Sequence, residues 1–285
     1  AVLLRDAEKT AADIRWMEPN EIQSGQARIR PGDILANLPW HPDCALWFDH
    51  HVSNRPEGHF RGAFDIVPSA ARVIYDYYLE RERLDRRYDE LIRHTDIIDG
   101  ALLNQDQVGE PEKYPHLLLS MTIKNDRYKD VAYWNQLVDQ LGHMDINEIL
   151  AQGPVKTRCE QVVEENKAWA SHLKAHTRIE NRISITDFRA LETVPSGNRF
   201  LSYAIFPDTI ASVRIRNDSQ GRLQVSVGKS IFNQGLNVNI GRMLACHGGG
   251  GHAGAGGCTL ESETADRALE QILETLFENR PDTGA

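Results

Sequence analysis

The sequence predicts an α/β fold in two domains: an N-terminal, mostly parallel and doubly wound sheet, joined by a helical linker to a smaller C-terminal α/β domain. Short apolar runs alternate with helical periodicity in the first part of the chain, which is typical of a parallel sheet. Residues 130–176 show helical stripes, and from residue 182 the pattern becomes strand-like. The 285 residues are enough for two ordinary cores. We place the domains at residues 1–125 and 181–285, with the linker at 126–180.

The chain opens on an apolar helical pattern, Ala1 to Leu4, with no capping residue before it. A helix that starts in this way predicts that a preceding first strand is missing. The alternation from Ala12 to Met17 predicts a strand. Two further strands are predicted at residues 34–36, ending at Asn37, and at residues 44–48, bounded by prolines on both sides.

Two helices are expected next, the first capped by Ser69 and the second ending near Asp99 and Gly100. Their apolar faces carry Val73, Ile74, Tyr77 and Tyr78 in the first and Tyr88, Leu91 and Ile92 in the second. The stripes between residues 130 and 176 predict further helices that pack the core and bridge the domains.

The C-terminal domain is predicted to hold four strands and two helices. The strands are expected at residues 183–185, 204–206, 212–215 and 223–227. One helix, around Ile240 to Leu244, leads into a glycine-rich loop, and the last helix carries an apolar stripe from Ala268 to Phe277.

Composition bounds the function. Hydrophobic residues make up 41% and charged residues 26%, which is typical of a globular protein, and no apolar stretch reaches the ~20 residues that span a bilayer. The four cysteines are scattered, so we expect free thiols and a cytoplasmic location. A net charge of −9 argues against a broad nucleic-acid-binding surface. A small anionic substrate remains compatible with it if bound metal supplies the positive charge.

Asp49, His50 and His51 directly follow the apolar run at residues 44–48. Polar groups at the end of a buried strand need partners. Imidazole and carboxylate are ordinary ligands of divalent metals, so the tripeptide predicts a metal site. A buried Asp–His hydrogen bond without metal is the alternative.

A second motif lies about two hundred residues later, where Gly248 to Gly251 precede His252. Glycine adopts positive φ without penalty, and successive free N–H groups can form an anion-binding nest. His252 could add a charge-assisted hydrogen bond to a phosphate. A flexible linker is the alternative, but the amphipathic pattern on both sides favours a phosphate loop.

The two motifs, in this order, resemble the DHH phosphoesterase superfamily, in the subgroup with a C-terminal DHH-associated domain. That subgroup includes exopolyphosphatase-like proteins, small-oligonucleotide exonucleases, 3′-phosphoadenosine 5′-phosphate phosphatases and cyclic-dinucleotide phosphodiesterases. The segment from Asn37 to His51 is most similar to exopolyphosphatase-related proteins. The resemblance covers nearly the whole chain. It implies metal-assisted hydrolysis with two divalent ions, most often Mn²⁺ with Mg²⁺ as the alternative, and a first strand ending in an Asp-x-Asp-Gly type motif, which this N-terminus lacks.

Carried over by position, the resemblance gives His50 the role of a metal ligand and Asp49 that of orienting a histidine. His51 would face the substrate phosphate as a hydrogen-bond donor or acid. Asp99 is the expected further ligand, with Asp96, one helical turn earlier, as its rival.

Asn37 is a departure, because most relatives have an aspartate there that bridges the metals. An amide is a weaker ligand for a hard cation, so the site would hold one metal, bind metal weakly, or have lost hydrolysis. Exopolyphosphatase-related proteins resemble this chain in having Asn.

In the second domain the resemblance implies that Gly249, Gly250, Gly251 and His252 hold a terminal phosphate or nucleotide. Lys229 and Ser230 stand where relatives have an arginine that faces the substrate, and a lysine would act there as a point charge. Arg214 and Arg216 are weaker candidates.

The expected function is removal of terminal phosphate or nucleotide units from a small anionic substrate in the cleft between the domains. A short oligonucleotide, a nucleotide bisphosphate and polyphosphate all fit, and a homodimer is compatible with the sequence. The alternative is a nucleotide- or oligonucleotide-binding protein without turnover. A kinase or a dinucleotide-dependent oxidoreductase is set aside, because the glycine run lacks the strand-to-helix context and the lysine spacing of a P-loop.

Overall fold

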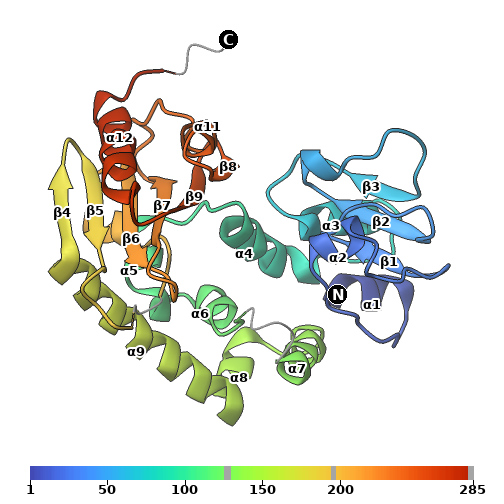
Figure 1. The fold of residues 1–285 in the computed structure, drawn as a ribbon. Coiled ribbons are helices and arrows are strands. Elements are labelled where there is room, and N and C mark those ends of the chain that lie inside the picture. The colour runs from blue at the N-terminus through green and yellow to red at the C-terminus, as the bar shows by residue number, and fades with distance from the viewer. Residues whose placement is uncertain (125–129, 194–196, 282–285) are drawn as a thin grey trace. The chain divides into compact units, whose positions relative to one another are not determined.

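A computed structural model describes residues 1–124, 130–193 and 197–281 (Figure 1). The chain forms two compact units. Unit 1 comprises Ala1–Leu102 and Tyr114–Cys159, and unit 2 comprises Leu103–Lys113 and Glu160–Ala285. The domain boundary predicted between residues 125 and 126 lies outside the described residues.

Unit 1 is built on a parallel three-stranded sheet in the order β1-β2-β3. Its strands are β1 (Ile34–Ala36), β2 (Leu46–Asp49) and β3 (Gly62–Phe64). Ala36 pairs with Phe48, and Asp49 pairs with Phe64. The first two strands and the parallel sheet were predicted, and β2 starts two residues later than expected.

Strand β2 is buried on both faces, which explains its unbroken apolar run. Phe48 is 0% exposed and packs with residues of the surrounding helices, whereas Trp47, also 0% exposed, packs on the opposite face with Ile22 and Leu35. The Trp47 indole N–H donates to the Leu38 carbonyl at 2.7 Å, so this polar atom is satisfied inside the core.

The strand predicted at Ala12–Met17 is wrong, because these residues form neither helix nor strand. The Trp16 indole N–H instead donates to Asn135 Oδ1 at 3.0 Å, and its ring packs edge-on against Trp134. The alternation therefore reflects a segment docked through its side chains rather than a sheet.

The helices of unit 1 supply the rest of its core. They are α1 (Val2–Glu8), α2 (Pro19–Gln23), α3 (Ala70–Leu79), α4 (Asp89–Asp99), α6 (Pro115–Met121), α7 (Val131–Leu141), α8 (Ile146–Ala151) and the first part of α9 (Gly153–His176), with short 3₁₀ turns η1 (Val52–Asn54) and η2 (Arg86–Tyr88). As predicted, Ser69 caps α3, since its hydroxyl accepts the Arg72 N–H at 3.0 Å. The buried hydroxyls of Tyr75 and Tyr78 donate to Asp89 and Glu8.

Unit 2 is built on a six-stranded sheet in the order β4-β5-β6-β7-β9-β8. Its strands are β4 (Thr177–Glu180), β5 (Ile183–Asp187), β6 (Ala211–Asn217), β7 (Leu223–Lys229), β8 (Gly250–His252) and β9 (Ala255–Leu260). Only β5 and β6 pair in parallel. The strand predicted at residues 204–206 is wrong. Helix α10 (Leu201–Ile205) lies there, because a three-residue apolar run does not distinguish helix from strand.

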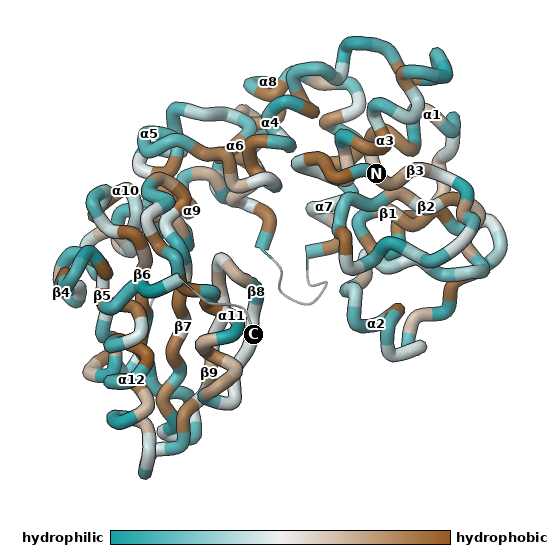
Figure 2. Tube along the Cα trace, turned by 90° about the horizontal axis from the view of Figure 1, so that it is seen from above, coloured by the Kyte–Doolittle hydropathy of each residue, from teal (hydrophilic) through white to brown (hydrophobic). Residues whose placement is uncertain are grey.

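Alternating residues of β6 and β7 form the core of unit 2 with α11 (Ile240–Ala245) and α12 (Ala265–Glu278). Figure 2 shows these two strands as mainly hydrophobic. The remaining elements are α5 (Gln105–Gly109), η3 (Pro111–Lys113) and the second part of α9. Among the residues that the structure describes, no helix combines the length and the apolar character needed to cross a bilayer.

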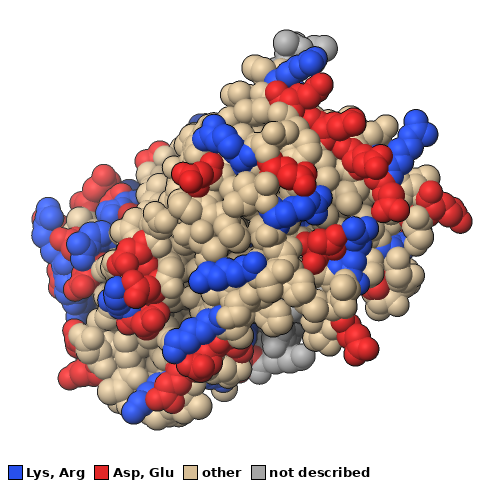
Figure 3. Space-filling model, turned by 90° about the vertical axis from the view of Figure 1, so that its left-hand side faces the viewer, with Lys and Arg blue, Asp and Glu red and all other residues tan. Residues whose placement is uncertain are grey.

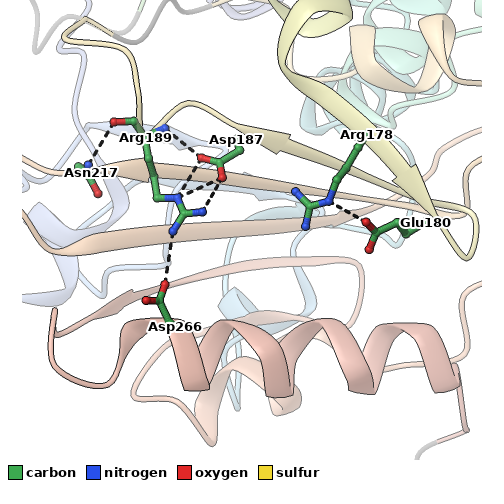
Figure 4. A network of polar contacts seen from close by, with 6 residues as sticks. All are labelled: Arg178, Glu180, Asp187, Arg189, Asn217 and Asp266. Atoms are coloured by element: carbon green, nitrogen blue, oxygen red, sulfur yellow. Dashed lines mark hydrogen bonds and ion pairs between the residues drawn. The ribbon is translucent and has the colours of Figure 1, made fainter.

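A polar network fixes one corner of this sheet (Figure 4). Arg189 forms a two-pronged ion pair with Asp187 at the end of β5, and its guanidinium also reaches Asp266 on α12 at 3.4 Å. Asn217 at the end of β6 donates to the Arg189 carbonyl at 3.4 Å. The arginine therefore has a structural role. On the face drawn in Figure 3, basic and acidic side chains are interspersed, without a broad basic patch.

Candidate functional site

The polar residues of unit 1 gather at one edge of the parallel sheet. Because the strands are parallel and in register, Asn37 after β1, Asp49 at the end of β2 and Val67 just after β3 all lie at their carboxyl ends. This is the edge where open α/β sheets place their ligands.

Asp49 organises the turn that follows β2. Its side chain is 0% exposed, and Oδ1 accepts the backbone N–H groups of His50 at 2.7 Å and His51 at 3.1 Å. The ring nitrogen Nδ1 of His51 lies 2.8 Å from the same oxygen, and Asn54 donates to Oδ2 at 2.8 Å. Four donors therefore compensate a buried carboxylate. The role of Asn54 was not predicted, since in the sequence it stands out only as a turn residue.

His50 presents a buried nitrogen lone pair. Its Nδ1 lies 2.9 Å from the Val67 carbonyl, which only accepts, so Nδ1 carries the proton and Nε2 does not. Within the described part of the chain, His50 Nε2 is a buried polar atom with no hydrogen-bond partner. A carbonyl on one ring nitrogen and a free lone pair on the other is the usual arrangement of a metal-binding histidine.

Asp99 lies opposite that lone pair. Its Oδ2 is 3.6 Å from His50 Nε2, at the end of α4. Asp96 is committed elsewhere, because its carboxylate accepts Ser69 Oγ at 2.7 Å and two guanidinium nitrogens of Arg72 at 2.9 and 2.7 Å. The geometry therefore favours Asp99 over its rival.

The donor set fits a divalent metal. The potential ligand atoms of Asp49, His50 and His51 lie within 4.8 Å of one another. Since Asp49 already has four donors, we infer that the ion would sit at His50 Nε2 and Asp99 rather than on Asp49. One imidazole and one carboxylate leave coordination positions open for water or substrate.

His51 is the exposed member of the motif, with 48% of its side chain accessible. Because Asp49 accepts its Nδ1–H, the other ring nitrogen, Nε2, is the one left for a ligand. The rings of His50 and His51 meet edge to face at 4.2 Å, so the two imidazoles border the same space.

Asn37 has a backbone φ of 59°, in the left-handed region that asparagine tolerates better than most residues. Its N–H donates to the Phe48 carbonyl at 2.9 Å, which prolongs the pairing of β1 with β2. Asn37 thus stands next to Asp49 at the sheet edge, with an uncharged side chain.

In unit 2 the glycine-rich segment is largely a hairpin rather than a loop. Strand β8 pairs antiparallel with β9, and Gly251 stands opposite Gly256. Before the hairpin, the N–H groups of Gly248 and Gly249 donate to the Ala245 and Leu244 carbonyls at 3.2 and 2.9 Å and so end α11. The predicted nest therefore has no free N–H at Gly249.

Close backbone packing explains most of these glycines. A Cβ on Gly249 would lie 2.4 Å from the Gly257 carbonyl oxygen, and a Cβ on Gly241 of α11 would lie 2.6 Å from that of Gly251. A Cβ on Gly250 would meet nothing within 4 Å. The helix and the hairpin can touch only because side chains are absent.

The other predicted residues of unit 2 differ in availability. Ser230 is buried, and its hydroxyl accepts the N–H groups of Phe232 and Asn233 at 3.3 and 3.1 Å, which gives it a turn-forming role. Lys229 is half-buried, and within the described residues no carboxylate pairs with its ammonium. The exposed His252 accepts the Gly254 N–H at Nδ1, at 3.1 Å, so its Nε2–H can donate to an anion.

Arg214 is a further cation in unit 2. It lies on β6 opposite Ser226, with its guanidinium 5.8 Å from the centre of the Trp169 ring. Burial lowers the pKa of this guanidinium, a property that its place in a strand pattern did not reveal. A partly buried guanidinium is suited to bind a phosphate.

Comparison with known proteins gives one strong match. No protein-family model and no curated protein sequence matches the chain. The structure of a pGpG-specific phosphodiesterase from Vibrio cholerae matches with a TM-score of 0.87 and 28% identity, over 98% of this chain and 95% of that one.

Two weaker matches have TM-scores under 0.5. An exopolyphosphatase-related protein from Bacteroides fragilis has a TM-score of 0.45 and 12% identity, over 82% of this chain and 64% of that one. RecJ from Thermus thermophilus, in complex with Mn²⁺, has a TM-score of 0.48 and 14% identity, over 83% and 41% of the two chains.

A likeness at 0.87 over nearly the full length, in a chain that carries Asp-His-His at the carboxyl edge of a parallel sheet, agrees with the resemblance found in the sequence. The protein belongs to the DHH superfamily of phosphoesterases.

Proposed function

We propose that this protein is a divalent-metal-dependent phosphodiesterase that cleaves very short linear oligonucleotides, with the dinucleotide pGpG as the first substrate to test. The observation that carries the proposal is the buried lone pair of His50, held in one tautomer by the Val67 carbonyl and facing Asp99 at 3.6 Å. The likeness to a pGpG-specific phosphodiesterase supports the choice of substrate.

His50 and Asp99 would hold the cation, Mn²⁺ or Mg²⁺. When bound, such an ion lowers the pKa of a coordinated water and offsets charge on the phosphate. Asp49 keeps the His51 ring in one orientation and one tautomer, so His51 Nε2 can hold a proton for the phosphate or its leaving oxygen. The neutral Asn37 removes one negative charge from this edge relative to an aspartate.

Unit 2 would supply the contacts to the rest of the substrate. His252 can donate from Nε2, and Lys229 and Arg214 can each place a positive charge against a phosphate. With Ser230 and the Gly249 N–H engaged in turns, we propose that side chains, more than a backbone nest, bind the anion. Gly250 and Gly251 would border this contact.

The test measures hydrolysis of pGpG, a longer oligonucleotide, a nucleotide bisphosphate and polyphosphate by protein loaded with Mn²⁺, loaded with Mg²⁺ or treated with chelator. We expect metal-dependent cleavage of pGpG, and a loss of more than about 100-fold in His50→Ala, because even partners that only support a ligand are worth about 10- to 100-fold. His143→Ala, an exposed histidine outside the motif, is the matched control. Faster cleavage of polyphosphate or bisphosphate than of pGpG would overturn the substrate assignment.

A binding protein without turnover is the second candidate, and the amide at Asn37 favours it. It predicts pGpG binding without hydrolysis under every metal condition. Gain of turnover in Asn37→Asp would then identify the amide as the cause.

A further inference from the structure

A second group of potential metal ligands lies in unit 1, apart from the Asp-His-His edge. Glu90 and His94 stand one turn apart on the first half of α4, and His116 lies at the start of α6. Their ligand atoms all lie within 4.8 Å of one another. Residues four apart share one face of a helix, so α4 offers two ligands towards the third.

The two imidazoles are arranged in a parallel stack. The ring centres of His94 and His116 are 4.2 Å apart, with 8° between their planes. His94 Nε2 lies 3.9 Å from Glu90 Oε1. The carboxylate and both rings therefore border one small space between the helices.

Both rings are suited to act as neutral ligands. Burial lowers the pKa of His94 and of His116, which removes the proton that would compete with a cation near neutral pH. The guanidinium of Arg93 lies 3.4 Å from His94 Nε2. Because a guanidinium only donates, that nitrogen presents its lone pair.

We propose that Glu90, His94 and His116 form a second cation site, with two imidazoles and one carboxylate, that binds Zn²⁺. Such ligands suit a borderline ion, and three of them leave a fourth position of a tetrahedral site for water. The site bridges α4 and α6, so an ion bound there would fasten together two helices that are distant in sequence.

Arg93 occupies the place of the ion's charge in the structure. It reaches both His94 and, at 4.0 Å, Glu90, and 64% of its side chain is exposed, so it can swing away. Arg93 would compete with the ion for the same two ligands. Its removal should therefore tighten binding, whereas removal of a ligand should weaken it.

The experiment measures Zn²⁺ affinity by competition with a chromophoric chelator, in a His50→Ala background that silences the first site. We expect His116→Ala to weaken Zn²⁺ binding about 100-fold and Glu90→Gln about tenfold, in proportion to the loss of a ligand or of its charge. We expect Arg93→Ala to strengthen it about threefold, the scale of an exposed charge contact. His143→Ala in the same background is the control.

Glu90 has 65% of its side chain exposed, so Glu90→Gln tests the site without disturbing the core. Equal affinity in the background protein, Glu90→Gln and His116→Ala would overturn the proposal, as would absence of Zn²⁺ binding in the background protein. Either result would mean that the imidazole stack only packs α4 against α6.

Discussion

At the carboxyl edge of unit 1 the side chains carry the chemistry, whereas in the glycine hairpin of unit 2 the backbone itself makes the contacts. Asp49 binds four donors, and His50 is left with one buried lone pair. In unit 2 the N–H of Gly249 ends a helix, and Gly241 packs directly on the backbone of Gly251. The two motifs are equally distinctive in the sequence and serve different physical ends.

The comparison teaches that a glycine run has two explanations. A nest needs free N–H groups, whereas close packing needs only the absence of Cβ atoms. Sequence composition favours neither, because both need the same residue. The distances to the nearest backbone atoms separate them here.

Substitution of two neighbouring glycines is the sharpest test of this difference. Gly249→Ala would force a Cβ to within 2.4 Å of a carbonyl oxygen, so we expect the free energy of unfolding to fall by about 3 kcal/mol, the upper range for overpacking. Gly250→Ala meets nothing within 4 Å, and we expect a change of no more than about 0.5 kcal/mol. Urea denaturation gives both values. Equal effects would contradict the packing explanation.

Two carboxylates on α4 test the edge of unit 1. Asp96 forms a two-pronged ion pair with Arg72, so we expect Asp96→Asn to lower the free energy of unfolding by about 2 kcal/mol, as for a charged hydrogen bond. Asp99→Asn should leave stability nearly unchanged and weaken Mn²⁺ binding at least about tenfold. Denaturation and metal titration of both variants separate the roles. If Asp96→Asn alone weakened metal binding, the assignment of Asp99 would be wrong.

Alkaline pH tests the core behind this edge. Burial, followed by the hydrogen bond to Asp89, raises the pKa of Tyr75 to about 12. Since an unfolded tyrosine titrates near 10, this stability is complete below about pH 10 and is lost as pH rises towards 12, by about 1 kcal/mol at pH 11. Burial raises the pKa of Tyr78 in the same direction.

Denaturation followed by tryptophan fluorescence between pH 8 and 11 measures this loss. Four of the five tryptophans lie in unit 1, and only Trp169 lies in unit 2, so the fluorescence reports mainly on the unit that holds Tyr75. Tyr75→Phe should flatten the dependence on pH. An unchanged slope in that variant would show that Tyr75 does not titrate as described.

Much of the fold could be predicted because burial leaves a pattern. Strand β2 is apolar on both faces and bounded by prolines, and Ser69 announces the start of α3. Strand β3 has only three residues and no periodic pattern, and glycine-rich β8 has almost no side chains to alternate. Such strands are defined by their partners, which a single sequence does not show.

The candidate site was predictable in kind but not in detail. Residue types and order pointed to His50 and Asp49, because few other uses exist for such groups at a strand end. The choice between Asp99 and Asp96 depends on which carboxylate Arg72 takes, and that contact joins two helices. The Glu90, His94 and His116 cluster likewise depends on the packing of α4 and α6.

The left-handed backbone of Asn37 has a consequence for how this protein can evolve. Asparagine and aspartate are among the few residues other than glycine that tolerate φ near 60°. Their codons differ by a single base, so one point mutation would exchange amide for acid at this edge while the chain keeps the same turn. The charge of the site and the stability of its scaffold can therefore be selected separately. A lineage could gain or lose a metal-bridging carboxylate here without a compensating second mutation.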